Sequence, residues 1–496
     1  MSKIAIGTTM ARYCNAPPYH PDTRYPESPM AATSGTPNPA YQLFRKLLID
    51  LEYDAHNAGR PEWNPLGHVI RPGNTVVIKP NFVLHENGSG GDLFAVITHP
   101  SILRAIADYV YLALKGRGRI IIADAPQMDC SWDRLSARLQ LDDVQRCYRE
   151  YLNFNLEVMD LRTFELIDAG QPAYAGNRRA RPGDPSGSVT FDLGTQSAFH
   201  GIPSENFYGA DYNRRETIAR HHDDVHQYEI SKTILSADVI ISVPKMKVHK
   251  KVGVTLNLKG LVGINTNKNC LIHYRLGTPS SGGDQLPDGA DKTDTAMIRS
   301  QRKLFDILLS RQTWWSDILY KTCRGMYRAL IKPFRPISTE SRLLDAGNWY
   351  GNDSAWRMTS DLAAILFYGD RHGNLHKTMQ RKIFCIVDGI IAGENEGPLA
   401  PDAKPAGILV AGENPLAVDI ATARLMGFDP RKIKSFAIRN SNVWNFGVQD
   451  FQGLDILLDG NHVPSPEFFS PEWKCPVPPF VPHPGWIGHI ELNTQP

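Results

Sequence analysis

The sequence predicts an α/β fold with a mostly parallel sheet, built from βαβ units and flanked by helices. Two observations predict this fold class. Short apolar runs rich in β-branched residues recur along the chain, and amphipathic helical patterns separate them. A chain of 496 residues is longer than one ordinary hydrophobic core requires. We therefore expect two lobes, with a helical insertion near residues 301–335.

The clearest βαβ unit lies in the first quarter of the chain. The run NTVVIKPN (74–81) is typical of a buried parallel strand. The helical pattern SILRAIADYVYLALK follows, with Thr98 as its expected N-cap, Pro100 in its first turn and Gly116 at its end. The run RIIIAD (119–124) completes the unit, which should have the usual right-handed connection.

Further strands are predicted at 238–244, 383–389 and 407–412, and the last leads into the helical pattern NPLAVDIATARLMG. The chain accordingly divides into five regions: an N-terminal α/β region (1–235) with a loop-rich excursion at about 165–215, a central segment (236–300), a basic amphipathic helical insertion (301–345), a C-terminal α/β region (346–463) and a Pro-rich tail (464–496).

Composition excludes several classes of protein. The 54 Lys and Arg residues nearly balance the 52 Asp and Glu residues, so no overall field favours nucleic acid. The N-terminus lacks a secretory signal and no apolar run is long enough to span a membrane, so we expect a cytoplasmic protein. The seven cysteines show no C-x-x-C pair, and we expect neither a zinc site nor an iron–sulfur cluster.

The segment 301–335 combines large apolar residues at helical spacing with eight basic and two acidic side chains. This pattern predicts a basic amphipathic helix or helix pair. Two interpretations remain open. The helices pack on the main lobe with their basic face in solvent, or they make peripheral contact with the inner face of the membrane.

The densest group of reactive side chains follows the strand at 238–244, in PKMKVHKKVGVTLNLKGLVG. Ligands of open α/β sheets bind beyond the carboxyl ends of parallel strands. Ammonium groups crowded there require either an anion or acidic side chains to compensate them. We therefore predict that a small anionic metabolite binds to seven side chains at or near these strand ends: Lys79, Asn81, Lys245, Lys247, Asn257, His273 and Arg275.

Two residues of the same segment are predicted to be catalytic. His249 is the one group in the cluster whose ordinary pKa lies near neutrality, so it is the first candidate for a general acid or base. Lys259 would stabilise a developing oxyanion or act as a second base.

A second constellation is DGIIAGENEGP, where Asp388 ends a strand and Glu394 and Glu396 follow in a Gly-rich loop. Hard oxygen ligands at this spacing suit a divalent metal such as Mg²⁺. The alternative is that these carboxylates cap helices or lie in solvated turns.

The fragments IKPNF, ITHP, ADVIISVPKMKVHKKVGVTLNLKGLVG, DGIIAGENEGP and NPLAVDIATARLMG, in this order, resemble the bacterial and archaeal family called domain of unknown function 362. The resemblance covers most of residues 70–430 and extends to features of longer members. Some members carry a ferredoxin-like module with regularly spaced cysteines, which this sequence lacks. The resemblance implies a shared architecture and a shared polar site, without a reaction.

The leading functional hypothesis is an acid/base enzyme of the lyase or isomerase type that acts on a carboxylate- or phosphate-bearing metabolite, with metal assistance as an option. A second hypothesis is a non-catalytic protein that binds a metabolite or envelope component and docks on membranes. A third, by analogy with the ferredoxin-fused relatives, is a redox component that works with a separate electron-transfer partner.

Overall fold

The structure is a computed structural model that describes residues 2–168, 175–209, 213–309, 313–331 and 337–492. Its main sheet contains eleven strands. They are β1 (Ser2–Thr8), β2 (Thr75–Pro80), β3 (Arg119–Asp124), β4 (Leu156–Asp160), β11 (Val239–Val243), β12 (Lys245–His249), β13 (Gly253–Val254), β15 (Lys382–Glu394), β16 (Asp402–Gly412), β17 (Leu454–Leu458) and β18 (Asn461–Val463).

The strand order is β18-β17-β1-β16-β15-β11-β2-β3-β4. The five strands from β15 to β4 run parallel to one another, and β1 runs parallel to β17. The antiparallel pairs are β16 with each of its two neighbours, β17 with β18, and β12 with β13, and β12 also pairs parallel with the end of β15. This arrangement confirms the predicted mostly parallel sheet. Strands from the predicted N-terminal and C-terminal regions lie in one sheet.

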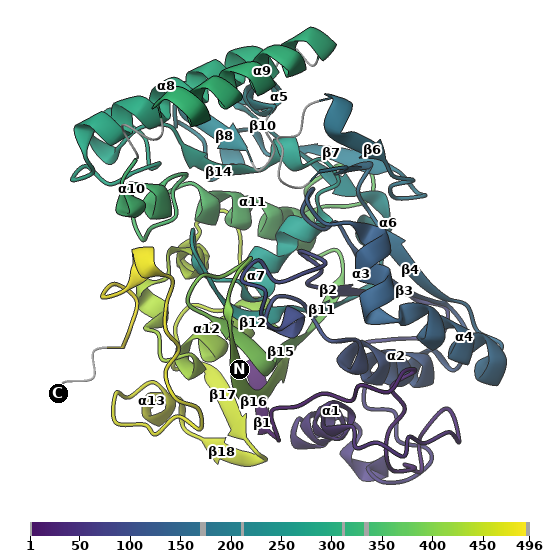
Figure 1. Cartoon of the computed structure of the whole chain (residues 1–496). Helices are drawn as coiled ribbons and strands as arrows, with labels where there is room; N and C mark the ends of the chain where they lie inside the picture. The colour runs from purple at the N-terminus through teal and green to yellow at the C-terminus, as the bar shows by residue number, and fades with distance from the viewer. Residues whose placement is uncertain (1, 169–174, 210–212, 310–312, 332–336, 493–496) are drawn as a thin grey trace.

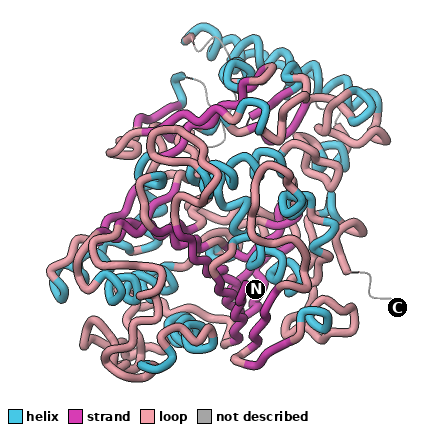
Figure 2. Tube along the Cα trace, turned by 180° about the vertical axis from the view of Figure 1, so that it is seen from behind, coloured by secondary structure: helices cyan, strands magenta, loops and turns pink. Residues whose placement is uncertain are grey.

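Helices cover both faces of the main sheet (Figures 1 and 2). The helices of the described residues are α1 (Pro39–Asp50), α2 (Pro100–Leu114), α3 (Trp132–Leu139), α4 (Leu141–Leu152), α5 (Arg214–Arg220), α6 (Lys232–Leu235), α7 (Leu256–Gly260), α8 (Lys292–Leu309), α9 (Trp314–Met326), α10 (Thr339–Leu344), α11 (Ala355–Tyr368), α12 (Pro415–Leu425) and α13 (Ser465–Phe468).

Each face of the sheet has its own hydrophobic cluster, because successive side chains of a strand point to opposite faces. In β2, Val76 and Ile78 pack with α1 and α2, whereas Val77 belongs to the other cluster, which includes residues of α7, α11 and α12. Fully apolar runs such as VVI in β2 are explained by this burial on both faces.

The helix after β2 differs from the prediction at its start. Thr98 was the expected N-cap, but His99 takes that position and its Nδ1 accepts from the Ser101 amide. Thr98 instead joins two strand ends: its hydroxyl accepts from the Asn81 amide at 2.9 Å and donates to the Val243 carbonyl at 2.7 Å. The prediction of Thr98 as the cap was therefore wrong, because this hydroxyl bridges the ends of β2 and β11.

Three small sheets lie outside the main sheet. They pair β5 (Phe164–Leu166) with β6 (Arg178–Ala180), β8 (Phe207–Gly209) with β14 (Ile272–Arg275), and β10 (Val225–Ser231) with both β7 (Ser188–Asp192) and β9 (His221–His222). The β8–β14 pair matters for the site described below, since it supplies Tyr208, His273 and Tyr274.

The predicted helical insertion is a pair of helices, α8 and α9, followed by a π-helical turn at Tyr327–Ile331. Residues 310–312 and 332–336 of the predicted segment lie outside the described residues. Figure 1 shows α8 and α9 side by side at the end of the molecule opposite α1. Within the ranges that the structure describes, every helix is too short or too polar to cross a membrane.

Candidate functional site

A cavity of about 300 Å³ opens beyond the carboxyl ends of β2 and β3, where the architecture predicts a ligand site. We call it the basic cavity. Its charged lining residues comprise six cations and one carboxylate: Lys247, Lys250, Lys251, Lys259, Lys268, Arg302 and Asp124. Two histidines, His249 and His273, also line it. The excess of cations makes this cavity suited to an anion.

The strand β12 explains how the Lys-x-Lys-x-His segment is placed. Alternate residues of a strand share a face. Met246 and Val248 belong to the apolar cluster that also contains α7. Lys245, Lys247 and His249 accordingly lie on the opposite side, and the last two reach the basic cavity.

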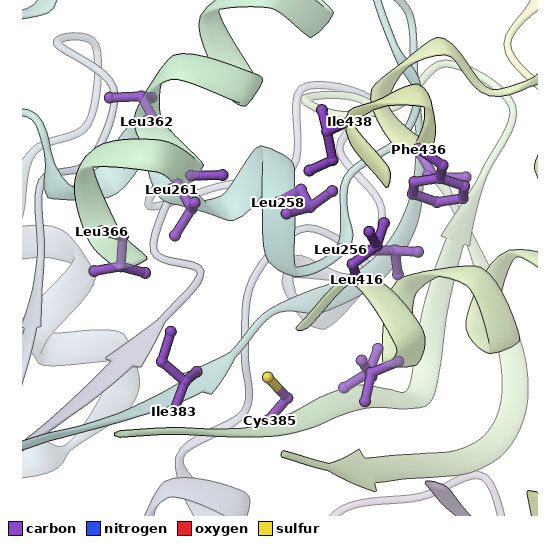
Figure 3. Close-up of a cluster of buried hydrophobic side chains, with 14 of the residues drawn as sticks. Leu256, Leu258, Leu261, Leu362, Leu366, Ile383, Cys385, Leu416, Phe436 and Ile438 are labelled. Atoms are coloured by element: carbon purple, nitrogen blue, oxygen red, sulfur yellow. The ribbon is translucent and has the colours of Figure 1, made fainter. Parts of the chain in front are cut away.

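The short helix α7 places Lys259. Its leucines Leu256 and Leu258 lie in the apolar cluster with Leu416 of α12 (Figure 3). Asp419, also on α12, accepts the backbone amides of Asn257 and Leu258, each at 2.8 Å. This carboxylate therefore satisfies amide groups at the start of α7 that have no partner within the helix. The apolar cluster holds the leucine face of α7 and Asp419 holds its first turn. In this position α7 places Lys259 in the lining of the cavity.

Lys259 is buried in the lining of the basic cavity. Its side chain is 8% exposed, and its ammonium has no hydrogen bond or ion pair among the described residues. Burial lowers the pKa of Lys259 to about 7. Lys259 is thus poised between its charged and neutral forms near physiological pH, and an anion in the cavity would favour the charged form.

The imidazole of His249 has a defined proton position. The backbone amide of Lys251 donates to its Nδ1 at 3.0 Å, so Nδ1 carries no proton and Nε2 must carry it. Burial, followed by the repulsion of Lys259, lowers the pKa of His249 well below its ordinary value. His249 is accordingly a neutral hydrogen-bond donor through Nε2, an atom with no partner among the residues described.

The imidazole of His273 has the opposite tautomer. Its Nδ1 lies 3.0 Å from the Leu271 carbonyl oxygen, which only accepts, so the proton sits on Nδ1. Its Nε2 therefore offers a lone pair. Burial and then Lys259 lower the pKa of His273 well below its ordinary value. One cavity is thus lined by a neutral imidazole that donates and a neutral imidazole that accepts.

Three other lysines of the cavity are anchored through carbonyl groups. Lys268 donates to the carbonyls of Ala125, Val262 and Asn265 at 2.9–3.0 Å. Lys247 donates to the carbonyls of Val96 and Pro398, and Lys251 donates to that of Ala346. Burial lowers the pKa of each of these three lysines. Carbonyl oxygens orient an ammonium without neutralising it, so the positive charge of the cavity remains available to a ligand.

Two further polar atoms in the lining have no partner. The side-chain oxygens of Asn81 and Thr255 are buried and make no hydrogen bond within the part of the chain that the structure describes. Buried polar groups are nearly always satisfied in folded proteins, and exceptions mark sites where a ligand or water supplies the bond. Both atoms therefore support the assignment of this cavity as a binding site.

Of the seven predicted anion ligands, three line the basic cavity and four do not. Asn81, Lys247 and His273 line the basic cavity. The other four lie outside its lining, and each contacts an aspartate: Lys79–Asp124 at 2.9 Å, Lys245–Asp388 at 3.0 Å, Asn257–Asp419 at 2.7 Å and Arg275–Asp353 at 3.3 Å. Both residues predicted to be catalytic, His249 and Lys259, line the cavity.

Two of the three predicted metal ligands have other partners, and the third is exposed. Asp388 forms an ion pair with Lys245 and accepts from the Tyr13 hydroxyl at 2.5 Å. Glu394 pairs with Lys404 at 2.9 Å, and Glu396 is exposed. Across the described ranges, no group of three or more His, Cys, Asp or Glu side chains is arranged to hold a metal ion.

Sequence reasoning missed Lys268, Tyr208 and Arg302 as lining residues and Asp419 as the support of α7. Lys268 follows two short turns with no periodic pattern, and Tyr208 lies in a loop-rich stretch. Nothing in the sequence distinguishes Arg302 from the other basic residues of the predicted insertion. Only Asp419 carried a signal, because an acidic residue inside the apolar run NPLAVDIATARLMG is unusual in a buried helix.

Fold and site together define an α/β protein with a buried, lysine-rich cavity at the carboxyl ends of parallel strands. The model of the family described as Domain of unknown function (DUF362) matches residues 162–424, more than half of the chain, and the protein belongs to this family. The matched range contains β12, α7 and Asp419, whereas the ends of β2 and β3 precede it. No curated protein matches the chain.

Proposed function

We propose that the protein is an acid/base enzyme of the lyase or isomerase type, acting on a small anionic metabolite that bears a carboxylate or phosphate group. One observation carries this proposal: His249 and His273 line the same basic cavity with opposite tautomers. Acid/base reactions that move a proton within a substrate need one group that accepts a proton and one that donates.

In the proposed mechanism, His273 removes a proton from the substrate through the lone pair of Nε2. The electron pair left behind develops negative charge on an oxygen of the anionic group, and the ammonium of Lys259 stabilises it. His273, now protonated, returns this proton to a leaving group or to the position that accepts a proton in an isomerisation, while the neutral imidazole of His249 donates a hydrogen bond from Nε2 to the developing oxyanion. Anion binding beside Lys259 offsets the repulsion that lowers the pKa of both histidines, and so strengthens His273 as a base.

The experiment that tests this proposal uses solvent deuterium, because the substrate is not needed in advance. The protein is incubated in D2O with a low-molecular-weight metabolite extract, and mass spectrometry follows the anions. We expect wild-type protein to convert an anion or to introduce deuterium into it. His273→Gln should do neither, while the exposed control His56→Gln behaves like wild type. An extract left unchanged by wild-type protein contradicts the proposal.

A second candidate function is a non-catalytic protein that binds a metabolite at a membrane surface. The observation that favours it is an exposed apolar face on α9, where Trp314 is 76% exposed and Trp315, Ile318 and Leu319 are exposed too. Apolar side chains beside basic residues are typical of helices that bind anionic lipid. Co-sedimentation with phosphatidylglycerol vesicles, lost in Trp314→Ala, would favour this function if no metabolite is converted.

A further inference from the structure

A second, larger cavity lies within the helical insertion. It has a volume of about 1040 Å³, at the upper end of the range for small-molecule sites. We call it the helix groove. Apolar groups on α8, α9 and the π-helical turn provide most of its wall, including Met297, Leu304, Phe305, Met326 and Leu330. Leu304 and Leu330 are about half-exposed or more, at 47% and 65%, so the groove opens to the surface.

The helix groove and the basic cavity share a residue. Arg302, on α8, lines both. Its guanidinium pairs with Asp345 at 3.1 Å and lies 5.8 Å from the centre of the Tyr208 ring. Asp345 lines the groove, whereas Tyr208 and Ala346 line the basic cavity. The two spaces therefore adjoin, with Arg302 at their junction.

The charges of the groove extend those of the basic cavity. Arg302, Arg324 and Arg342 line it, against the single carboxylate of Asp345. An apolar wall with basic groups, continuous with a basic cavity, is complementary to a molecule that has an apolar part and an anionic part.

We propose that the substrate of this enzyme is an amphiphile. Its anionic head group binds in the basic cavity beside Lys259, and its apolar chain lies in the helix groove. This inference rests on the proposed function, because it assigns the head group to the same cavity. It also gives the helical insertion a role, since α8 and α9 then select substrates that carry a chain.

The test compares ligands that differ only in chain length. Isothermal titration calorimetry at pH 7 measures methyl phosphate and octyl phosphate, the latter below its critical micelle concentration. Because each buried methylene strengthens binding, octyl phosphate should bind wild-type protein about tenfold more tightly or better. The double variant L304D/L330D, changed at two exposed groove positions, should lose this advantage and keep its affinity for methyl phosphate.

The matched control is I167D/I307D, which changes two exposed apolar residues, the second of them on α8, that do not line the groove. It should keep the full advantage of octyl phosphate. Equal affinities in wild-type protein, or an advantage that survives in L304D/L330D, would overturn the inference. An advantage lost equally in the control would overturn it as well.

Two further arms separate this inference from the proposed function. Weaker methyl phosphate binding in Lys259→Met reports on the basic cavity, whereas octyl glucoside, which has the chain without the charge, reports on the groove. If methyl phosphate does not bind, the proposed function fails, and absence of octyl glucoside binding then overturns the inference too.

Phosphatidylglycerol vesicles show whether the amphiphile comes from a membrane or from solution. Tight vesicle binding that needs Trp314 indicates a bilayer lipid, and absence of such binding indicates a free amphiphile.

Discussion

His249 presents a hydrogen-bond donor to the basic cavity, and His273 presents a hydrogen-bond acceptor to the same cavity. The Nδ1 of His249 accepts from the Lys251 amide at 3.0 Å, and the Nδ1 of His273 donates to the Leu271 carbonyl at 3.0 Å. Backbone groups therefore fix both tautomers, so the difference persists without a ligand. The two rings have complementary roles before any substrate arrives.

The first prediction separates these roles. His273→Gln should lower the rate of substrate turnover or deuterium incorporation by about 10²–10⁴-fold, because the glutamine amide cannot take the proton. Affinity for an anion, measured by calorimetry, should stay within about threefold of wild type, since the lysines supply the binding charge.

His249→Gln tests the donor. A glutamine amide can still donate a hydrogen bond from a position near that of Nε2, but it cannot release a proton. We therefore expect turnover to fall less in His249→Gln than in His273→Gln, whereas His249→Ala, which removes the donor, should lower turnover further. A loss in His249→Gln as severe as that in His273→Gln, or turnover equal to wild type in His249→Ala, would contradict the proposed role.

Lys259 should make anion binding dependent on pH. Its pKa lies at about 7, so the charged fraction falls about tenfold between pH 6 and pH 8. The affinity for sulfate, which keeps its charge over this range, should therefore fall by about tenfold. Lys259→Arg should bind sulfate at both pH values, because a guanidinium stays protonated. Equal pH dependence in wild type and Lys259→Arg would assign the titration to another group.

The lowered pKa of Lys259 also makes the stability of the protein depend on pH. The folded-state pKa of Lys259 is lower than its ordinary value of 10.5, so the folded protein has released a proton that the unfolded chain keeps. The contribution of this group to stability therefore rises from about pH 7 toward pH 10.5. In urea unfolding, Lys259→Met should gain stability over wild type at pH 6 and lose that gain as pH rises.

The fold was predictable where local pattern determines it. The run at 407–412 is apolar throughout and that at 119–124 is apolar between its two end residues, and burial on both sheet faces explains this pattern. The antiparallel placement of β16 and β18 was not predictable, because strand order and direction depend on contacts between distant segments. Thr98 shows that local pattern can also mislead. It has the sequence position of a helix N-cap, but its hydroxyl bridges the ends of two strands.

The site was predictable as a cluster and less so as individual residues. Lys247, His249 and Lys259 come from one continuous segment, and all three reach the cavity. Lys79 and Lys245 have the same residue type and the same position at strand ends, yet each is paired with an aspartate far away in sequence. Spacing along a chain does not reveal such partners, so free and paired lysines look alike before the fold is known.

Asp419 should be required for the position of α7. It is 1% exposed and accepts two backbone amides at the start of this helix. Asp419→Ala should lower the free energy of unfolding by about 1–3 kcal/mol, because buried amides lose their acceptor. Anion affinity should fall too, since Lys259 lies on α7. Urea unfolding and sulfate titration measure the two effects, with the exposed Glu150→Ala as the control. Unchanged values in both measurements would exclude this role.

Gly263 allows the Lys79–Asp124 pair to form beside the cavity. A Cβ at this position would lie 1.8 Å from Asp124 Oδ1 and 2.7 Å from Lys79 Nζ, distances that no folded structure accommodates. Gly263→Ala must displace one member of a buried ion pair. Breaking such a pair by one partner costs about 3–5 kcal/mol, because it leaves an uncompensated buried charge. We therefore expect a loss of this order in urea unfolding.

Gly260 is the matched control, three residues earlier and at the end of α7. Its nearest neighbour to an added Cβ is Pro244 Cβ at 3.9 Å, an ordinary contact, and its backbone is helical. Gly260→Ala should therefore be neutral or stabilise the protein by up to about 1 kcal/mol, because alanine loses less backbone entropy in a helix. The two substitutions add the same methyl group, yet one should lower the free energy of unfolding and the other should leave it unchanged or raise it. Equal losses in both variants would show that the ion pair does not determine the effect at Gly263.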